Sequence, residues 1–231
     1  MKKLAIFDLD GTLLYSLEDL ADATNHALQK NGLPIQELDK YKYFVGNGVF
    51  KLIERALPEE FKKNEAVFNA VLSDFRTYYG KHSEDKSKLY DGIEETVKKL
   101  HEMGVLLAVA SNKPDEFTKV LVSRLFGDLF DYAQGSLPEI PTKPAPDIAF
   151  MILEKFGISA DDAVFIGDTN VDINTGKAAG IETIGCLWGY RTFEELKEAI
   201  EKYIVYYNEK RIKEKLGWMS PVEYRLSTLA A

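Results

Sequence analysis

The stretch over residues 4–14 constrains the fold of this chain more than any other, because an apolar run ends there in two closely spaced acids. Residues 4–7 are short, continuous and apolar, which is typical of a buried strand. Asp8 and Asp10 follow one residue apart, before a Gly-Thr turn. Alternate residues of a strand point the same way, so both carboxylates are expected to face one reacting group. Open α/β sheets bind ligands beyond the carboxyl ends of their strands, which is where this pair would lie.

The acidic pair has two interpretations. Like charges at this spacing are costly unless a cation or a proton compensates them, so Asp8 and Asp10 indicate a divalent metal site. A strand that simply ends in an acidic, solvated turn would give the same residues. The stretch taken alone leaves these two interpretations about even.

The rest of the chain predicts an α/β fold with a helical insertion. Residues 17–88 contain helical patterns and no convincing strand, and Ser16 is placed to cap the first helix. From residue 89 onward, strand patterns alternate with helical ones, which predicts βαβ units and a mainly parallel sheet. The expected strands are residues 105–110, 130–133, 163–167 and 181–184, and the expected helices are residues 17–31, 48–57, 59–79, 92–103, 115–126, 147–156 and 171–179.

The composition narrows the classes of protein. The chain has 231 residues and a net charge of −8, which argues against general binding to nucleic acid or to anionic membranes. Cys186 is the single cysteine, so no internal disulfide is possible and a reducing compartment fits. The N-terminus is no signal peptide and no stretch is apolar enough to span a bilayer, so we expect a cytoplasmic protein.

Three further segments carry polar residues just after strands or in loops: Ser111-Asn112, Lys143, and Gly167 to Asp172 with its acid Asp168. Each segment alone is weak evidence for a functional site. A hydroxyl or an acid at such a position often caps a helix, and a lysine in a loop is often a solvated surface charge. Their common placement beyond strands is what a shared site at one sheet edge requires.

In this order, the residues resemble the motifs of the haloacid dehalogenase-like hydrolase superfamily. The motifs are Asp-x-Asp-Gly-Thr at residues 8–12, Ser111, Lys143, and Gly-Asp-x-x-x-Asp at residues 167–172. The resemblance covers residues 1–198. It implies a Rossmann-like catalytic core over residues 1–14 and 89–198, and an all-helical cap domain over residues 15–88.

The resemblance also implies a role for each residue. Asp8 would be the nucleophile that forms an aspartyl-phosphate, Asp10 the general acid and base, and Lys143 the cation that neutralises charge on Asp8 and the phosphoryl group. Mg²⁺ would be held by the Asp8 carboxylate, the Asp10 backbone carbonyl and Asp168, with Asp172 directly or through water. The expected phosphate donors are the Ser111 and Asn112 side chains and the amides of Gly11 and Thr12.

Within the superfamily, the chain is most similar to phosphoglycolate phosphatases. Asp10 separates it from the dehalogenases, which lack an acid there, and the Gly-bearing loop over residues 44–48 could approach a small carboxylate or simply be an interhelical turn. Arg55 could pair with such a carboxylate or form a surface salt bridge. Tyr15 departs from the family, which usually has Asp at the entrance to the cap. Residues 188–191 are expected to form a loop near the rim of the site.

The function that follows is a Mg²⁺-dependent phosphatase, a hydrolase for a small phosphorylated metabolite, with 2-phosphoglycolate as the leading substrate. The alternatives are a sugar phosphomutase of the β-phosphoglucomutase type, a pyrophosphatase or nucleotidase, or a non-catalytic regulatory or binding protein. We expect a monomer or a homodimer with no nucleic-acid or membrane partner.

Residues 199–231 form an atypical C-terminal tail. The family would continue after residue 196 with a short strand and a closing helix. Here Tyr-Asn-x-x-Arg at residues 207–211 and Leu-Gly-x-x-Ser-Pro-x-x-Tyr at residues 216–224 resemble the end of an insertion-sequence transposase. We expect a helical tail, and hypothesise that a mobile element overwrote the 3′ end of the gene. An ordinary amphipathic terminal helix is the alternative.

Overall fold

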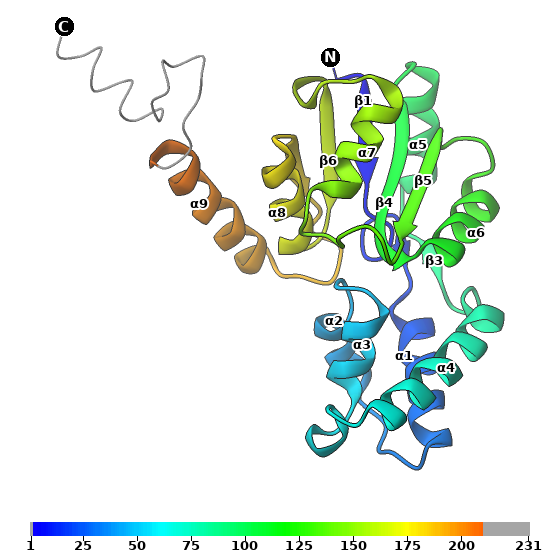
Figure 1. Cartoon of the computed structure of the whole chain (residues 1–231). Coiled ribbons are helices and arrows are strands. Elements are labelled where there is room, and N and C mark those ends of the chain that lie inside the picture. The colour runs from blue at the N-terminus through cyan, green and yellow to red at the C-terminus, as the bar shows by residue number, and fades with distance from the viewer. Residues whose placement is uncertain (1, 210–231) are drawn as a thin grey trace, which may run out of the picture. The chain divides into compact units, whose positions relative to one another are not determined.

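The computed structural model describes residues 2–209 (Figure 1). The chain divides into two compact units, Met1–Arg191 and Thr192–Ala231, and each unit is described by itself. No helix among the described residues is long and apolar enough to cross a membrane.

The first unit is built on a five-stranded sheet. Its strands are β5 (Tyr132–Ser136), β4 (Leu106–Pro114), β1 (Leu4–Phe7), β6 (Ala163–Gly167) and β7 (Glu182–Gly185), in this spatial order. Every pairing is parallel, and the central strand β1 has Ile6 in register with Ala108 on one side and Phe165 on the other. The α/β fold expected from the sequence is therefore confirmed. The parallel arrangement brings the carboxyl ends of β1, β4 and β6 to one edge.

Helices cover both faces of this sheet (Figure 1). Alternate residues of β1 point to opposite faces, so Phe7 joins the apolar cluster of α5 (Ile93–Glu102) and α6 (Asp115–Phe126). Ile6 joins the cluster that includes α7 (Asp147–Phe156). The helix α8 (Asn170–Ala179) adds Ala179 to this second cluster. Burial on both faces explains why β1 reads as an uninterrupted apolar run.

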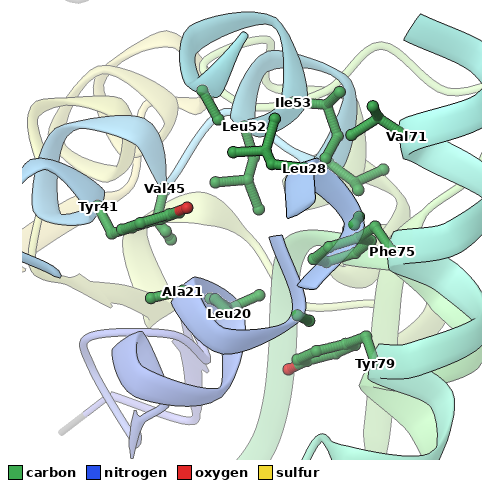
Figure 2. Close-up of a cluster of buried hydrophobic side chains, with 14 of the residues drawn as sticks. Leu20, Ala21, Leu28, Tyr41, Val45, Leu52, Ile53, Val71, Phe75 and Tyr79 are labelled. Carbon is green, nitrogen blue, oxygen red and sulfur yellow. The ribbon is translucent and has the colours of Figure 1, made fainter. Parts of the chain in front are cut away.

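Residues 15–88, which we call the cap segment, fold into helices with an apolar core of their own. The helices are α1 (Leu17–Lys30), α2 (Leu38–Phe44), α3 (Val49–Ala56) and α4 (Glu65–His82), with a 3₁₀ turn η1 over Glu59–Phe61. Figure 2 shows side chains of this core, among them Leu28 of α1, Ile53 of α3 and Phe75 of α4, which are all fully buried. The helical patterns in the sequence therefore reflect burial within the cap segment itself.

Two short strands join the cap segment to the sheet. The strands β2 (Leu14–Tyr15) and β3 (Lys88–Leu89) are antiparallel, with Leu14 opposite Leu89. They are only two residues long each, too short to show the alternation by which strands are recognised in a sequence, and the prediction missed them.

Three local predictions in the cap segment were wrong. The helix α2 was not predicted; only Tyr41 of its residues is fully buried, so the helix lacks a strong apolar stripe. Residues 59–79 were expected to form one helix, but η1 precedes Asn64, whose side chain accepts from the Val67 amide and starts α4. Ser16 precedes α1 without a side-chain capping bond, because its hydroxyl is used elsewhere.

The second unit contains the helix α9 (Phe193–Glu209). Thr192 and Glu195 start the helix reciprocally: the Thr192 amide donates to the Glu195 carboxylate at 2.9 Å, and the Glu195 amide donates to the Thr192 hydroxyl at 3.3 Å. This is the capping-box arrangement at a helix N-terminus. The tail predicted over residues 199–231 falls within α9 up to Glu209, and its remainder lies outside the described residues.

Candidate active site

The carboxyl edge of the sheet gathers the residues that the sequence singled out. Asp8 and Asp10 follow β1, Ser111 lies near the end of β4, and Asp168 directly follows β6. Lys143 comes from the loop between β5 and α7. The side chains of Asp8, Ser111, Lys143 and Asp168 are buried, which is uncommon for charged groups unless they are paired or bind an ion.

Lys143 connects two of the acids. Its Nζ lies 2.9 Å from Asp8 Oδ1 and donates to Asp172 Oδ1 at 2.8 Å. Asp8 Oδ1 also accepts from the Leu9 amide at 2.7 Å. Asp172 Oδ2 accepts from the Thr169 amide and hydroxyl at 3.1 and 2.7 Å, as part of a capping box that starts α8. Both acids are therefore fixed by hydrogen bonds from the ends of regular elements.

Asp168 is enclosed by two loops that approach it closely. The Tyr190 amide donates to its Oδ2 at 2.7 Å, and the Thr12 hydroxyl donates to its Oδ1 at 3.3 Å. Gly11 has a φ of 89°, and a Cβ atom there would overlap the Asp168 carboxylate. A Cβ at Gly189 would overlap the same side chain. Glycine is needed at both positions for the loops to close around this acid.

Three acids form a cluster of the kind that holds a metal ion. Oxygen atoms of Asp8, Asp168 and Asp172 lie within 4.8 Å of one another, and all three residues are buried. Burial, opposed by Lys143, raises the pKa of Asp8 to about 7. Burial and the charges of Asp172 and Asp8 raise the pKa of Asp168 well above its ordinary value. A divalent cation would relieve this repulsion, and carboxylate oxygens are the ligands that Mg²⁺ prefers, so the residues fit such an ion.

Asp10 has a different set of partners from the cluster. Lys113 Nζ donates to both of its carboxylate oxygens, at 2.7 and 2.8 Å. The Ser16 hydroxyl donates to Asp10 Oδ1 at 2.5 Å, and Ser16 is itself 3.2 Å from the Tyr190 hydroxyl. Burial lowers the pKa of Lys113, but its interactions with Asp10 and Tyr79 together outweigh this and hold the pKa above its ordinary value. The site thus contains two buried lysines, one paired with Asp10 and the other with Asp8 and Asp172.

Asn112 joins the cap segment to the sheet. Its side-chain amide donates to the carbonyls of Gly46 and Lys143, each at 2.9 Å, and its Oδ1 accepts from the Lys143 amide at 2.8 Å. Through these bonds the Asn112 side chain holds the backbone of two loops, and its binding to phosphate stays a prediction. Ser111 lies beside Asn112 and accepts from the Lys113 amide at 3.2 Å, which leaves its hydroxyl hydrogen available to another acceptor.

A small cavity of about 40 Å³ lies between the cap segment and the carboxyl edge of the sheet. Asp8, Asp10, Ser111 and Lys113 line it from the sheet. The cap segment supplies mostly apolar wall residues, among them Leu20, Val45, Val49, Leu52, Phe75 and Tyr79. The cavity therefore has a polar side next to the two acids and an apolar side opposite.

Arg55 does not line this cavity. Its guanidinium donates to the carbonyls of Tyr43 and Phe44, each at 3.0 Å, and to Asn47 Oδ1 at 2.8 Å. Neither of the two uses considered from the sequence, a substrate carboxylate or a surface salt bridge, describes these contacts. Arg55 instead holds the loop that contains Gly46 in place.

The sequence prediction assigned no contact with the acids to Ser16, Lys113, Thr169 or Tyr190. A signal existed for Lys113, since it lies two residues after Ser111 on a strand and so points to the same side. Ser16 and Tyr190 are separated by 174 positions in the chain, and nothing in the sequence indicated that they meet. The expectation that residues 188–191 lie near the site is confirmed by the Tyr190 contact with Asp168.

The chain is similar to known proteins over most of its length. The family model described as haloacid dehalogenase-like hydrolase matches residues 5–186. A phosphoglycolate phosphatase of Haemophilus influenzae is 37% identical over 205 residues, covering 85% of this chain and 91% of that protein. A phosphoglycolate phosphatase of Pseudomonas savastanoi is 34% identical over 195 residues, covering 82% of this chain and 71% of that protein.

Solved structures agree with this similarity. A crystal structure from Lactobacillus delbrueckii has a TM-score of 0.80 and 34% identity, covering 86% of this chain and 92% of that one. A predicted phosphoglycolate phosphatase from Haemophilus somnus has a TM-score of 0.79 and 33% identity, covering 86% of this chain and 91% of that one. Both likenesses extend across the sheet and the cap segment.

The C-terminal part is similar to a different class of protein. The family model described as integrase core domain matches residues 184–229. The resemblance of the tail to the end of a transposase is thus confirmed. The match overlaps the end of the first family match only at residues 184–186.

Proposed function

The chain belongs to the haloacid dehalogenase-like hydrolase family, and from this membership we propose that it is a Mg²⁺-dependent phosphatase whose substrate is 2-phosphoglycolate. We infer the type of reaction from the different partners of the two acids Asp8 and Asp10. Asp8 belongs to the cluster of three acids and contacts Lys143. Asp10 lies outside that cluster and contacts Lys113 and Ser16 instead. This difference supports a reaction in which one acid attacks phosphorus and the other moves a proton.

The reaction that we propose has two steps. An Asp8 carboxylate oxygen attacks phosphorus, the bond from phosphorus to the ester oxygen breaks, and Asp10 gives its proton to that oxygen. Asp10 then takes a proton from the water that attacks the aspartyl-phosphate, which releases phosphate and restores Asp8. The contacts of Asp8 with Leu9 and Lys143 both involve Oδ1, so Oδ2 is the oxygen available for attack.

Lys143 and Ser111 support the transferred group in this proposal. The Lys143 ammonium, 2.9 Å from Asp8, neutralises negative charge where the phosphoryl group arrives. The Ser111 hydroxyl donates to a phosphoryl oxygen, while Asn112 keeps the Lys143 loop in position. Mg²⁺ would be held by Asp8, Asp168 and Asp172, and when bound it would neutralise charge on the phosphoryl oxygens.

The size of the cavity supports a small leaving group. A volume of about 40 Å³ corresponds to roughly three water molecules, at about 10–15 Å³ each. A leaving group of a few heavy atoms, such as glycolate, fits this space better than a sugar or a nucleoside. The cavity thus supports a leaving group smaller than a sugar or a nucleoside.

Phosphate release from a panel of esters tests the proposal. The panel contains 2-phosphoglycolate, glucose 1-phosphate, a nucleoside monophosphate and pyrophosphate, each with and without Mg²⁺. We expect the wild type to release phosphate fastest from 2-phosphoglycolate, and Asp8→Asn to lose at least about 10³-fold in rate, because it removes the nucleophile. Asp128→Asn, a change at an exposed acid, is the matched control and should retain wild-type activity.

The outcomes separate the alternatives. Equal release by the wild type and Asp8→Asn would exclude Asp8 as the nucleophile. Rearranged glucose phosphate without free phosphate, detected by ³¹P NMR, would indicate a phosphomutase. No turnover of any ester would support a non-catalytic binding protein.

A further inference from the structure

We propose that Lys113 and Tyr79 together bind a carboxylate on the leaving group and so select substrates that carry one. This inference rests on the phosphatase function proposed above and names the residues that would recognise the leaving group.

Lys113 is the cation on the leaving-group side of the site. The acid that protonates the ester oxygen must lie beside the leaving group, and in the proposed reaction this acid is Asp10. Lys113 contacts Asp10 directly, whereas Lys143 contacts Asp8 and Asp172. Among the described residues that line the cavity, Lys113 is the only one with a cationic side chain. An anionic leaving group in this cavity therefore has one cationic side chain with which to pair.

Tyr79 supplies a free hydrogen-bond donor at the same cavity. Its side chain projects from α4 with the hydroxyl pointing away from the helix (Figure 2). Among the described residues, its hydroxyl is the only buried side-chain polar atom without a hydrogen-bond partner. A buried hydroxyl without a partner is costly, so this atom indicates a missing acceptor. Tyr79 also lies against Lys113, whose Nζ is 5.0 Å from the centre of its ring.

Pairing with a leaving-group carboxylate is compatible with the role of Asp10. Ser16 donates to Asp10 at 2.5 Å independently of Lys113, so Asp10 keeps a partner when the ammonium turns to the substrate. Lys113 comes from β4 and Tyr79 from the cap helix α4. A carboxylate bound by both would therefore bridge the sheet and the cap segment, which a neutral leaving group would do less strongly.

A matched pair of substrates tests the inference: 2-phosphoglycolate and its neutral amide, phosphoglycolamide. The two have leaving groups of nearly the same size, and only the first carries the charge. The readout is the ratio of their kcat/KM values, because any loss from disturbing Asp10 affects both substrates and cancels. We expect the wild-type ratio to favour 2-phosphoglycolate by about 100-fold, the range of a charged hydrogen bond in a buried site.

Lys113→Met should reduce this ratio to near one, and Tyr79→Phe should reduce it by about 10-fold while keeping the ring. Tyr79→Phe adds no charge and changes no apolar contact. It therefore tests the inference by itself if circular dichroism shows that Lys113→Met does not fold. Lys119→Met, at an exposed lysine of α6, is the control and should leave the ratio unchanged.

The remaining outcomes overturn different statements. An unchanged ratio in both variants would mean that Lys113 only positions Asp10, and the inference would be wrong while the phosphatase function stands. A wild-type enzyme that hydrolyses both compounds equally well would overturn the inference alone. A wild-type protein that hydrolyses neither would overturn the proposed function and this inference together.

Discussion

Asp8 illustrates how burial changes the chemistry of one residue. Desolvation, opposed by Lys143, raises its pKa from 3.8 to about 7, and the neighbouring charge of Asp172 acts in the same direction as burial. Without a metal ion, ionised Asp8 is therefore less favourable in the folded protein than in the unfolded chain. The residue that is proposed to act as the nucleophile destabilises the fold whenever it is charged and uncompensated.

The first prediction concerns pH in the absence of metal. The raised folded-state pKa favours folding below pH 4, and this contribution is lost as the pH rises through about 7. In EDTA, we expect Asp8→Asn to have a higher Tm than the wild type at pH 8, with a smaller difference at pH 5. A tenfold change in proton affinity is worth about 1.4 kcal/mol, or about 3–5 °C at this chain length.

The control for this prediction is Asp128→Asn, which changes an exposed acid. Its Tm should follow the wild type across the pH range. A constant Tm difference between Asp8→Asn and the wild type from pH 5 to pH 8 would contradict the prediction.

At the residue scale, the sequence predicted the groups whose roles follow from charge and position after a strand. Asp8, Asp168 and Lys143 come together as their spacing indicated. Ser16 was instead predicted to cap a helix, because a serine before a helix fits that role equally well. Its bond to Asp10 depends on where the chain turns after β1, which a sequence pattern does not encode.

At the scale of elements, the junction between the cap segment and the sheet depends on Asp19. This residue lies in the first turn of α1 and is buried. Its carboxylate accepts from the amides of Lys86 and Ser87 and from the Ser87 hydroxyl, at distances of 2.6 to 3.1 Å. It thereby ties the chain entering the cap segment to the chain leaving it, beside the β2–β3 pair.

The second prediction is that Asp19→Ala weakens this junction. The change leaves two backbone amides without their acceptor, which should lower the free energy of unfolding by about 2–4 kcal/mol. Asp22→Ala is a matched control on the same helix, since Asp22 pairs with Lys86 at 2.7 Å but is half exposed. It should cost less than about 1 kcal/mol, as exposed ion pairs do. Urea denaturation of both variants measures the difference, and equal losses would contradict the role given to Asp19.

Elements with a clear apolar pattern were predicted better than those without one. The strand β6 agrees with the prediction at both ends, whereas β4 begins one residue later and ends four residues later than expected. The strands β2 and β3 were missed because two residues give no measurable periodicity, and the helix α2 was missed because only Tyr41 of its residues is fully buried. Their existence depends on tertiary contacts, such as the pairing of Leu14 with Leu89.

At the scale of the molecule, the cluster of Asp8, Asp168 and Asp172 would couple the binding of a metal ion to the stability of the fold. Asp8, Asp168 and Asp172 are buried where the paired strands β1 and β6 end. Their mutual repulsion therefore destabilises the middle strands of the sheet. A divalent cation that binds only the folded state would stabilise it by mass action.

The third prediction is that Mg²⁺ raises the Tm of the wild type. At about 100 times its Kd, the ion should add about 2.7 kcal/mol, or about 5–10 °C for a chain of this length. Asp168→Asn should lose most of this increase, because it removes one buried ligand while keeping the shape of the side chain. Differential scanning fluorimetry in EDTA, Mg²⁺ and Ca²⁺ measures it, and an increase that persists in Asp168→Asn would place the ion elsewhere.

The way the cap segment is attached has a consequence for how such proteins diversify. Its two ends are neighbouring strands, with Leu14 opposite Leu89, so they are separated by about one strand spacing of 4.7–4.9 Å. Any helical module whose ends meet at this distance could be exchanged by recombination without disturbing the register of the sheet. The proposed proton and phosphoryl chemistry would be inherited with the sheet, and the choice of leaving group would change with the module.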